Sequence, residues 1–200
     1  MAEQAQKMSL LGNRMKLTNE RQLMGNDFIK AVAFAAEKHK NQRRKDAQAS
    51  PYINHPIALA NVLANEGDIA NKDVLIGALL HDTIEDTETT PEELKAIFGE
   101  KIASIVMEVT DDKNLPKAQR KALQIEHAAH ASMEAKLVKL ADKICNLRDM
   151  LSSPPQDWTL QRKRDYFTWA EEVVAGLRGS NSKLEKIFDG LMEKGATLSD

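Results

Sequence analysis

The stretch "VLIGALLHDTIEDT", Val74–Thr87, changes character at its midpoint. Its first half is apolar and predicts the end of a helix. The second half brings His81 and Asp82, followed about one helical turn later by Glu85 and Asp86. So much charge directly after an apolar helix marks these four side chains as candidates for a functional site.

The rest of the chain repeats the spacing of a helix. Apolar residues recur three and four positions apart, without the sustained alternation typical of strands. The segment "TTPEE" is a strong start signal, with Thr90 as the cap and Glu93 completing a capping box. We therefore predict an all-α fold, with one helix beginning at Pro116 and others over residues 27–40, 56–63, 73–81, 91–98, 102–109, 135–150, 158–177 and 182–194.

Length and composition limit the class of protein. The chain has 200 residues, and we expect a poorly ordered N-terminal extension over 1–22 and one domain over 23–200. The formal net charge of −2 gives no overall attraction to nucleic acid or anionic lipid, so neither partner is expected. A single cysteine and the lack of an apolar run long enough to span a membrane favour the cytoplasm.

Two further residues complete a candidate metal site. His81 and Asp82 alone are too few, because a hydrolytic metal site takes three or four protein ligands. His55 in "YINHP" precedes a predicted helix, and Asp142 in "KLADKICNL" is a carboxylate on the most apolar helix. Two imidazoles and two carboxylates suit Mn²⁺, Fe²⁺ or Zn²⁺ better than Ca²⁺.

Each of these residues also has an ordinary structural interpretation. The dipeptide "HD" is common, and His55 could be a capping or core histidine. Asp142 could pair with Lys139 or Arg148 on its own helix.

Four stretches in order make this chain resemble a known family: "AAEKHKNQRRKDAQASPYINHPIALA", "ALLHDTIEDT", "VTDDKNLPK" and "AKLVKLADKICNLRDM". It resembles the HD-domain phosphohydrolases, in particular the RelA/SpoT-type alarmone hydrolases and their small stand-alone members, from about residue 27 to 191. The resemblance implies an all-α HD-domain helical bundle with a central metal site and one Mn²⁺ per chain. It implies as ligands His55, His81, Asp82 and Asp142.

The resemblance also assigns the catalytic carboxylates to Glu85 and Asp86, which would hold and deprotonate the attacking water. The alternative for this pair is a solvated helix end. The basic segment "KHKNQRRKD" is a solvated face, a nucleic-acid patch or part of a nucleotide pocket. By resemblance, Arg44 and Lys45 line that pocket, and a planar guanidinium group suits base stacking and phosphate binding.

The long predicted helix carries further candidates for substrate contact. Lys139, Asp142 and Asn146 share a helical face, which places a cation and an amide beside the predicted metal. Asn146 resembles the family asparagine that contacts the substrate. Lys139 and Lys143 could meet phosphate, although lysines on helices are more often solvated.

The implied activity is removal of the 3′-pyrophosphate from guanosine 3′,5′-bis(diphosphate), ppGpp, or its pentaphosphate relative, releasing GDP or GTP and pyrophosphate. We expect neither a synthetase half nor a regulatory domain, and a homodimer is compatible with the sequence. One alternative is an NADPH 2′-phosphatase of the same fold. Another is a non-catalytic nucleotide-sensing module, which would be expected to lack a ligand or a catalytic carboxylate.

Overall fold

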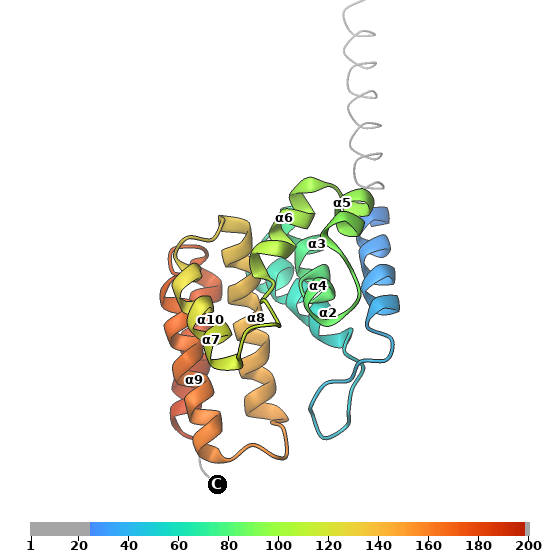
Figure 1. The fold of residues 1–200 in the computed structure, drawn as a ribbon. Coiled ribbons are helices and arrows are strands. Elements are labelled where there is room, and N and C mark those ends of the chain that lie inside the picture. Colours follow the sequence, from blue (N-terminus) through green and yellow to red (C-terminus); the bar gives the residue numbers. More distant parts are fainter. Residues whose placement is uncertain (1–24, 199–200) are drawn as a thin grey trace, which may run out of the picture.

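The computed structural model describes residues 25–198, so the extension predicted over 1–22 lies outside the described residues. Within the described range all regular secondary structure is helical, and one isolated antiparallel bridge joins Arg43 to Pro51. The all-α prediction is therefore confirmed (Figure 1). No helix in this range combines the length and apolar character needed to cross a bilayer.

The helices follow one another along the chain, and the longest connection, residues 39–53, joins the first helix to the second. A first helix covers residues 25–38. It is followed by α2 (Asn54–Asn61) with a π-helical continuation (Val62–Glu66), α3 (Lys72–Leu80), α4 (Thr83–Asp86), α5 (Pro91–Phe98), α6 (Glu100–Val109), α7 (Lys117–Ala128), α8 (Met133–Ser152), α9 (Leu160–Ala175) and α10 (Ser182–Ala196).

Helix α3 is buried between two hydrophobic cores. Every residue from Val74 to Leu80 is buried. Leu75 and Ala78 belong to a core shared with α2, α8, α9 and α10, whereas Ile76 and Leu79 belong to one shared with residues 25–38, α5 and α6. A helix that is apolar all round is stable only in the interior, so α3 ends inside the protein.

Helix α8 divides the molecule. Figure 1 shows α9 and α10 on one side of α8 and α2 and α3 on the other, and α8 packs against all four helices. Its residues Leu140, Ala141 and Ile144 are fully buried. A polar side chain on α8 that faces α2 and α3 therefore reaches the place where α3 ends.

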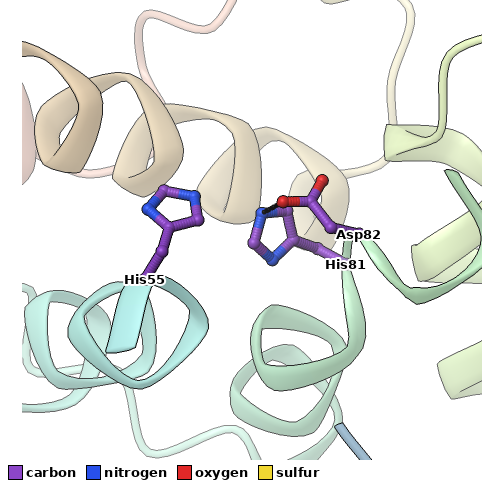
Figure 2. Close-up of side chains that lie close together, drawn as sticks. All are labelled: His55, His81 and Asp82. Atoms are coloured by element: carbon purple, nitrogen blue, oxygen red, sulfur yellow. Dashed lines mark ion pairs between the residues drawn. The ribbon is translucent and has the colours of Figure 1, made fainter. Parts of the chain in front are cut away.

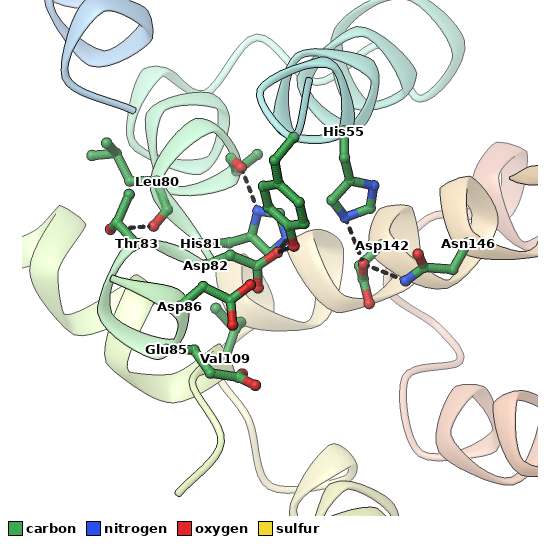
Figure 3. Close-up of polar contacts among 12 residues, drawn as sticks. His55, Leu80, His81, Asp82, Thr83, Glu85, Asp86, Val109, Asp142 and Asn146 are labelled. Carbon is green, nitrogen blue, oxygen red and sulfur yellow. Dashed lines mark hydrogen bonds and ion pairs between the residues drawn. The ribbon is translucent and has the colours of Figure 1, made fainter. Parts of the chain in front are cut away.

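The sequence predicts Glu85 and Asp86 one helical turn beyond His81 and Asp82, but the chain bends between α3 and α4 and does not continue as one helix. Helix α3 ends at Leu80, and Asp82 has φ −99° and ψ 0°, outside the helical region. The buried hydroxyl of Thr83 donates to the Leu80 carbonyl at 2.7 Å, which stabilises the bend before α4 begins (Figure 3). This bend separates the His81–Asp82 pair from the Glu85–Asp86 pair.

Candidate active site

Three of the four predicted metal ligands meet in one place. One ligand atom from each of His55, His81 and Asp82 lies within 4.8 Å of the other two (Figure 2). His55 comes from the first turn of α2, and His81 and Asp82 come from the bend after α3. Both histidines are buried, and their closeness to Asp82 is what the metal-site prediction requires, although burial alone is also compatible with a core histidine at position 55.

The protein backbone fixes which nitrogen of His81 is available. His81 Nδ1 lies 2.8 Å from the Ala78 carbonyl oxygen, which can only accept, so Nδ1 carries the proton. Nε2 is buried without a hydrogen bond and lies 2.8 Å from an Asp82 oxygen (Figure 2). A lone pair this close to a carboxylate requires a cation, which a divalent metal ion can provide.

A proton competes with a metal ion for the lone pair of His81 Nε2. Burial opposes a charge on His81, but the neighbouring Asp82 carboxylate outweighs it and raises the pKa of the imidazole to about 9. Burial opposes ionisation of Asp82 as well, yet His81 holds the pKa of this carboxyl well below its usual range. The Tyr52 hydroxyl also donates to Asp82. The donor set therefore fits a divalent metal ion bound in exchange for a proton.

Asp142 lies at the edge of this group. Its Oδ1 is 3.2 Å from His55 Nε2 and accepts from Asn146 Nδ2 at 2.7 Å (Figure 3). Its Oδ2 is 3.1 Å from Lys143 Nζ. Asp142 therefore does not pair with Lys139 or Arg148, and its role as a fourth ligand stays a prediction.

The carboxylate pair is partly buried. The Glu85 and Asp86 side chains are only 19% and 18% exposed, so the interpretation as a solvated helix end is wrong. Glu85 Oε2 accepts from the backbone N–H of Asp111 at 3.2 Å. Burial, with the Asp82 charge, raises the pKa of Glu85 to about 7. Asp86 accepts from Gln42 at 2.7 Å and pairs with Lys113.

A cavity of about 440 Å³ opens beside these groups. Acidic and imidazole side chains line one wall, including His55, Asp82, Glu85 and Asp142. Cationic side chains from several elements line it as well: Arg44, Lys117, Arg120, Lys121, Lys143 and Arg162. The cations of α7 and α9 were not predicted from the sequence, although Lys117, Arg120 and Lys121 recur at helical spacing after Pro116.

A second hollow of about 410 Å³ adjoins the first and is lined by Lys45 as well as apolar and aromatic side chains. Arg44 and Tyr52 line both hollows. The Arg44 guanidinium donates to Asn146 Oδ1 at 3.2 Å and to Asp149 at 2.5 Å, and it lies 5.7 Å from the centre of the Tyr52 ring. Both hollows therefore combine cationic side chains with flat aromatic ones, and Tyr52, Trp158 and Tyr166 line both of them.

Two lysines of α8, Lys139 and Lys143, are placed differently from the prediction. Both are buried rather than solvated, with 7% and 4% exposure for Lys139 and Lys143. Lys139 donates to the Val109 carbonyl at 3.4 Å and lines neither hollow, so its predicted contact with substrate phosphate is not supported. Lys143 lines the cationic cavity but is held by Asp142 and Gln124. The physical reason is that α6 packs on α8, with Val109 at its end beside Lys139, and that Gln124 of α7 reaches Lys143.

A family profile described as the HD domain matches residues 31–168. The helical fold and the buried group of His55, His81 and Asp82 are consistent with this match. The chain belongs to the HD-domain family.

Three similar proteins are each described by the hydrolysis of ppGpp. The guanosine-3′,5′-bis(diphosphate) 3′-pyrophosphohydrolase MESH1 of Danio rerio is 54% identical over 172 residues, which are 86% of this chain and 96% of that protein. MESH1 of Homo sapiens is 51% identical over the same shares of the two chains. A solved structure described as a metazoan orthologue of SpoT that hydrolyses ppGpp has a TM-score of 0.83 and 46% identity, and covers 86% of this chain and 97% of its own.

Proposed function

We propose that this chain is a metal-dependent hydrolase that removes the 3′-pyrophosphate from ppGpp and its pentaphosphate relative. The observation that carries the proposal is the meeting of His55, His81 and Asp82 within 4.8 Å, beside a buried carboxylate pair and a cation-lined cavity. Similarity to MESH1 proteins over 86% of the chain supports the choice of substrate.

The metal that we propose is one Mn²⁺ per chain, held by His55, His81, Asp82 and Asp142. Mixed imidazole and carboxylate donors suit this ion. When bound, the metal supplies Lewis-acid chemistry, polarising a phosphoryl oxygen and making water more acidic.

Glu85 accepts the proton of the attacking water in this proposal. A carboxylate with a pKa of about 7 can take up a proton and release it again near neutral pH. The Asp111 N–H fixes the orientation of the carboxylate. Asp86, held by Gln42 and Lys113, orients the water.

The two hollows take the two ends of the nucleotide. Arg44, Lys45 and the aromatic walls would receive the base, since guanidinium groups and aromatic rings stack on flat rings. The cations of α7 and α9 would bind the phosphates, with the Asn146 amide between the two hollows.

NADPH 2′-phosphatase activity is the second candidate. The observation that favours it is the presence of two adjoining hollows of about 440 and 410 Å³, which suit a dinucleotide. A non-catalytic sensing module is disfavoured, because all six positions carry a metal-binding or acidic side chain.

We further propose the cytoplasm as the compartment and residues 23–200 as the catalytic unit. The buried free thiol of Cys145 fits a reducing environment. The cations of α7 and α9 line the cavity and the net charge is −2, which argues against a nucleic-acid partner.

The experiment that tests the proposal is Glu85→Gln, assayed with Mn²⁺ and ppGpp. Glutamine keeps the shape but cannot accept the proton, so kcat should fall by about 10²–10⁴ while bound Mn²⁺ stays near wild type and the melting temperature does not fall. The exposed neighbour Glu88 provides the control, and Glu88→Gln should retain full turnover. Near wild-type kcat in Glu85→Gln would remove Glu85 from catalysis.

A further inference from the structure

Gln124 on α7 is hydrogen-bonded at both ends of its side-chain amide. Its Nε2 donates to Asp111 Oδ2 at 2.6 Å, and its Oε1 accepts from Lys143 Nζ at 3.1 Å. An ammonium group can only donate and a carboxylate can only accept, so the two partners fix the orientation of the amide. Neither the sequence motifs nor the mechanism above gives Gln124 a role.

The nitrogen of the Gln124 amide is connected through Asp111 to Glu85, the proposed catalytic carboxylate. Asp111 lies in the segment 110–116 between α6 and α7, which has no regular helix. Its side chain is held by Gln124, and its backbone N–H donates to Glu85 Oε2 at 3.2 Å. Since the segment is irregular, the Gln124 contact restricts where this N–H points.

The oxygen of the Gln124 amide is connected through Lys143 to Asp142, the predicted metal ligand. Lys143 Nζ lies 3.1 Å from Asp142 Oδ2, and the lysine is 4% exposed. The ammonium also lies 4.4 Å from the centre of the Trp169 ring. Gln124 supplies the remaining polar contact of this buried charge, and it thereby limits the positions from which Lys143 can hold Asp142.

We propose that Gln124 is a positioning residue that acts on both halves of the active site. Its amide nitrogen holds Asp111 and, through it, Glu85. Its amide oxygen holds Lys143 and, through it, Asp142. The inference rests on the proposed function for the roles of Glu85 and Asp142.

Two variants separate the two contacts in the full chain. Gln124→Glu keeps an acceptor for Lys143 but places a carboxylate against Asp111, so kcat should fall about 10- to 100-fold while the Mn²⁺ dissociation constant stays within about threefold. Gln124→Met loses both contacts, so kcat should fall and the Mn²⁺ dissociation constant should rise, each by about 10- to 100-fold. Gln119→Met, on the exposed side of the same helix, should change neither quantity.

Mn²⁺ titration by calorimetry is made without substrate, so it tests the inference even if wild type does not hydrolyse ppGpp. In that case the proposed function fails, while a weaker Mn²⁺ affinity in Gln124→Met alone still supports the metal half of the inference. Equal Mn²⁺ affinities in all variants would overturn it. A rise in KM with unchanged kcat and Mn²⁺ affinity would also overturn it, because Gln124 would then be a substrate contact.

Discussion

At the scale of single residues, the site depends on groups held in one protonation state and one orientation. The Ala78 carbonyl fixes the His81 tautomer, and the Asp111 N–H fixes one oxygen of Glu85. Neither contact could be read from the motif, because each depends on where the backbone places a polar group. Residue types identified the chemistry, whereas local geometry determines which atoms carry it out.

The raised pKa of Glu85 predicts a pH-dependent effect on stability. Burial raises the pKa of Glu85 from about 4.5 in the unfolded chain to about 7 in the folded one. The charge on Glu85 therefore destabilises the fold increasingly from about pH 4.5 to about pH 7, fully above about pH 7, and not below about pH 4.5. Glu85→Gln should therefore raise the melting temperature of the metal-free protein at pH 8 more than at pH 5. A gain of equal size at both values would show that the folded pKa is not raised.

Arg44 is expected to act in binding rather than in the chemical step. Arg44→Ala should raise KM for ppGpp about tenfold, on the order of 1.4 kcal/mol, with a smaller effect on kcat, because stacking stabilises the ground and transition states alike. Lys40→Ala is the control, since this exposed lysine pairs with Glu37, three residues earlier in the chain. A loss confined to kcat would place Arg44 on the reacting phosphate.

At the scale of elements, the packing of α3 against α6 depends on a glycine. A Cβ at Gly77 would lie 2.8 Å from Ile105 Cγ2, so Gly77→Ala forces the isoleucine to move and should cost about 1–3 kcal/mol of unfolding free energy. Gly190 within α10 is the matched control, because a Cβ there meets no atom within 4 Å. Gly190→Ala should instead stabilise by about 0.5–1 kcal/mol. Urea denaturation of both variants tests the pair, and a stabilised Gly77→Ala would contradict the packing.

Helices were largely predictable from sequence, and contacts between them were not. Thr90 caps α5 by accepting from the Glu93 N–H at 3.1 Å, as predicted. The Glu93 carboxylate, however, pairs with Lys38 at 2.9 Å, a residue distant in sequence. The buried positions of Lys139 and Lys143 were missed for the same reason, since periodicity does not say which helix covers which face.

At the scale of the whole molecule, α3 contributes to both hydrophobic cores, and this packing places the polar residues that follow it, His81 and Asp82, beside α8. The sequence motifs predicted the acidic and imidazole wall of the cavity. The cationic wall needs α7 and α9 together, and residues such as Lys117 and Arg162 meet only in the folded chain. The substrate is therefore bound between segments that no single motif connects.

Product analysis tests the central claim most directly. The purified full chain is incubated with ppGpp and Mn²⁺, with and without a chelator, and NADPH is supplied in a parallel reaction. We predict equal amounts of GDP and pyrophosphate from ppGpp, no products in chelator, and a higher kcat/KM for ppGpp than for NADPH. Absence of pyrophosphate from ppGpp, together with phosphate release from NADPH, would contradict the account and favour the 2′-phosphatase.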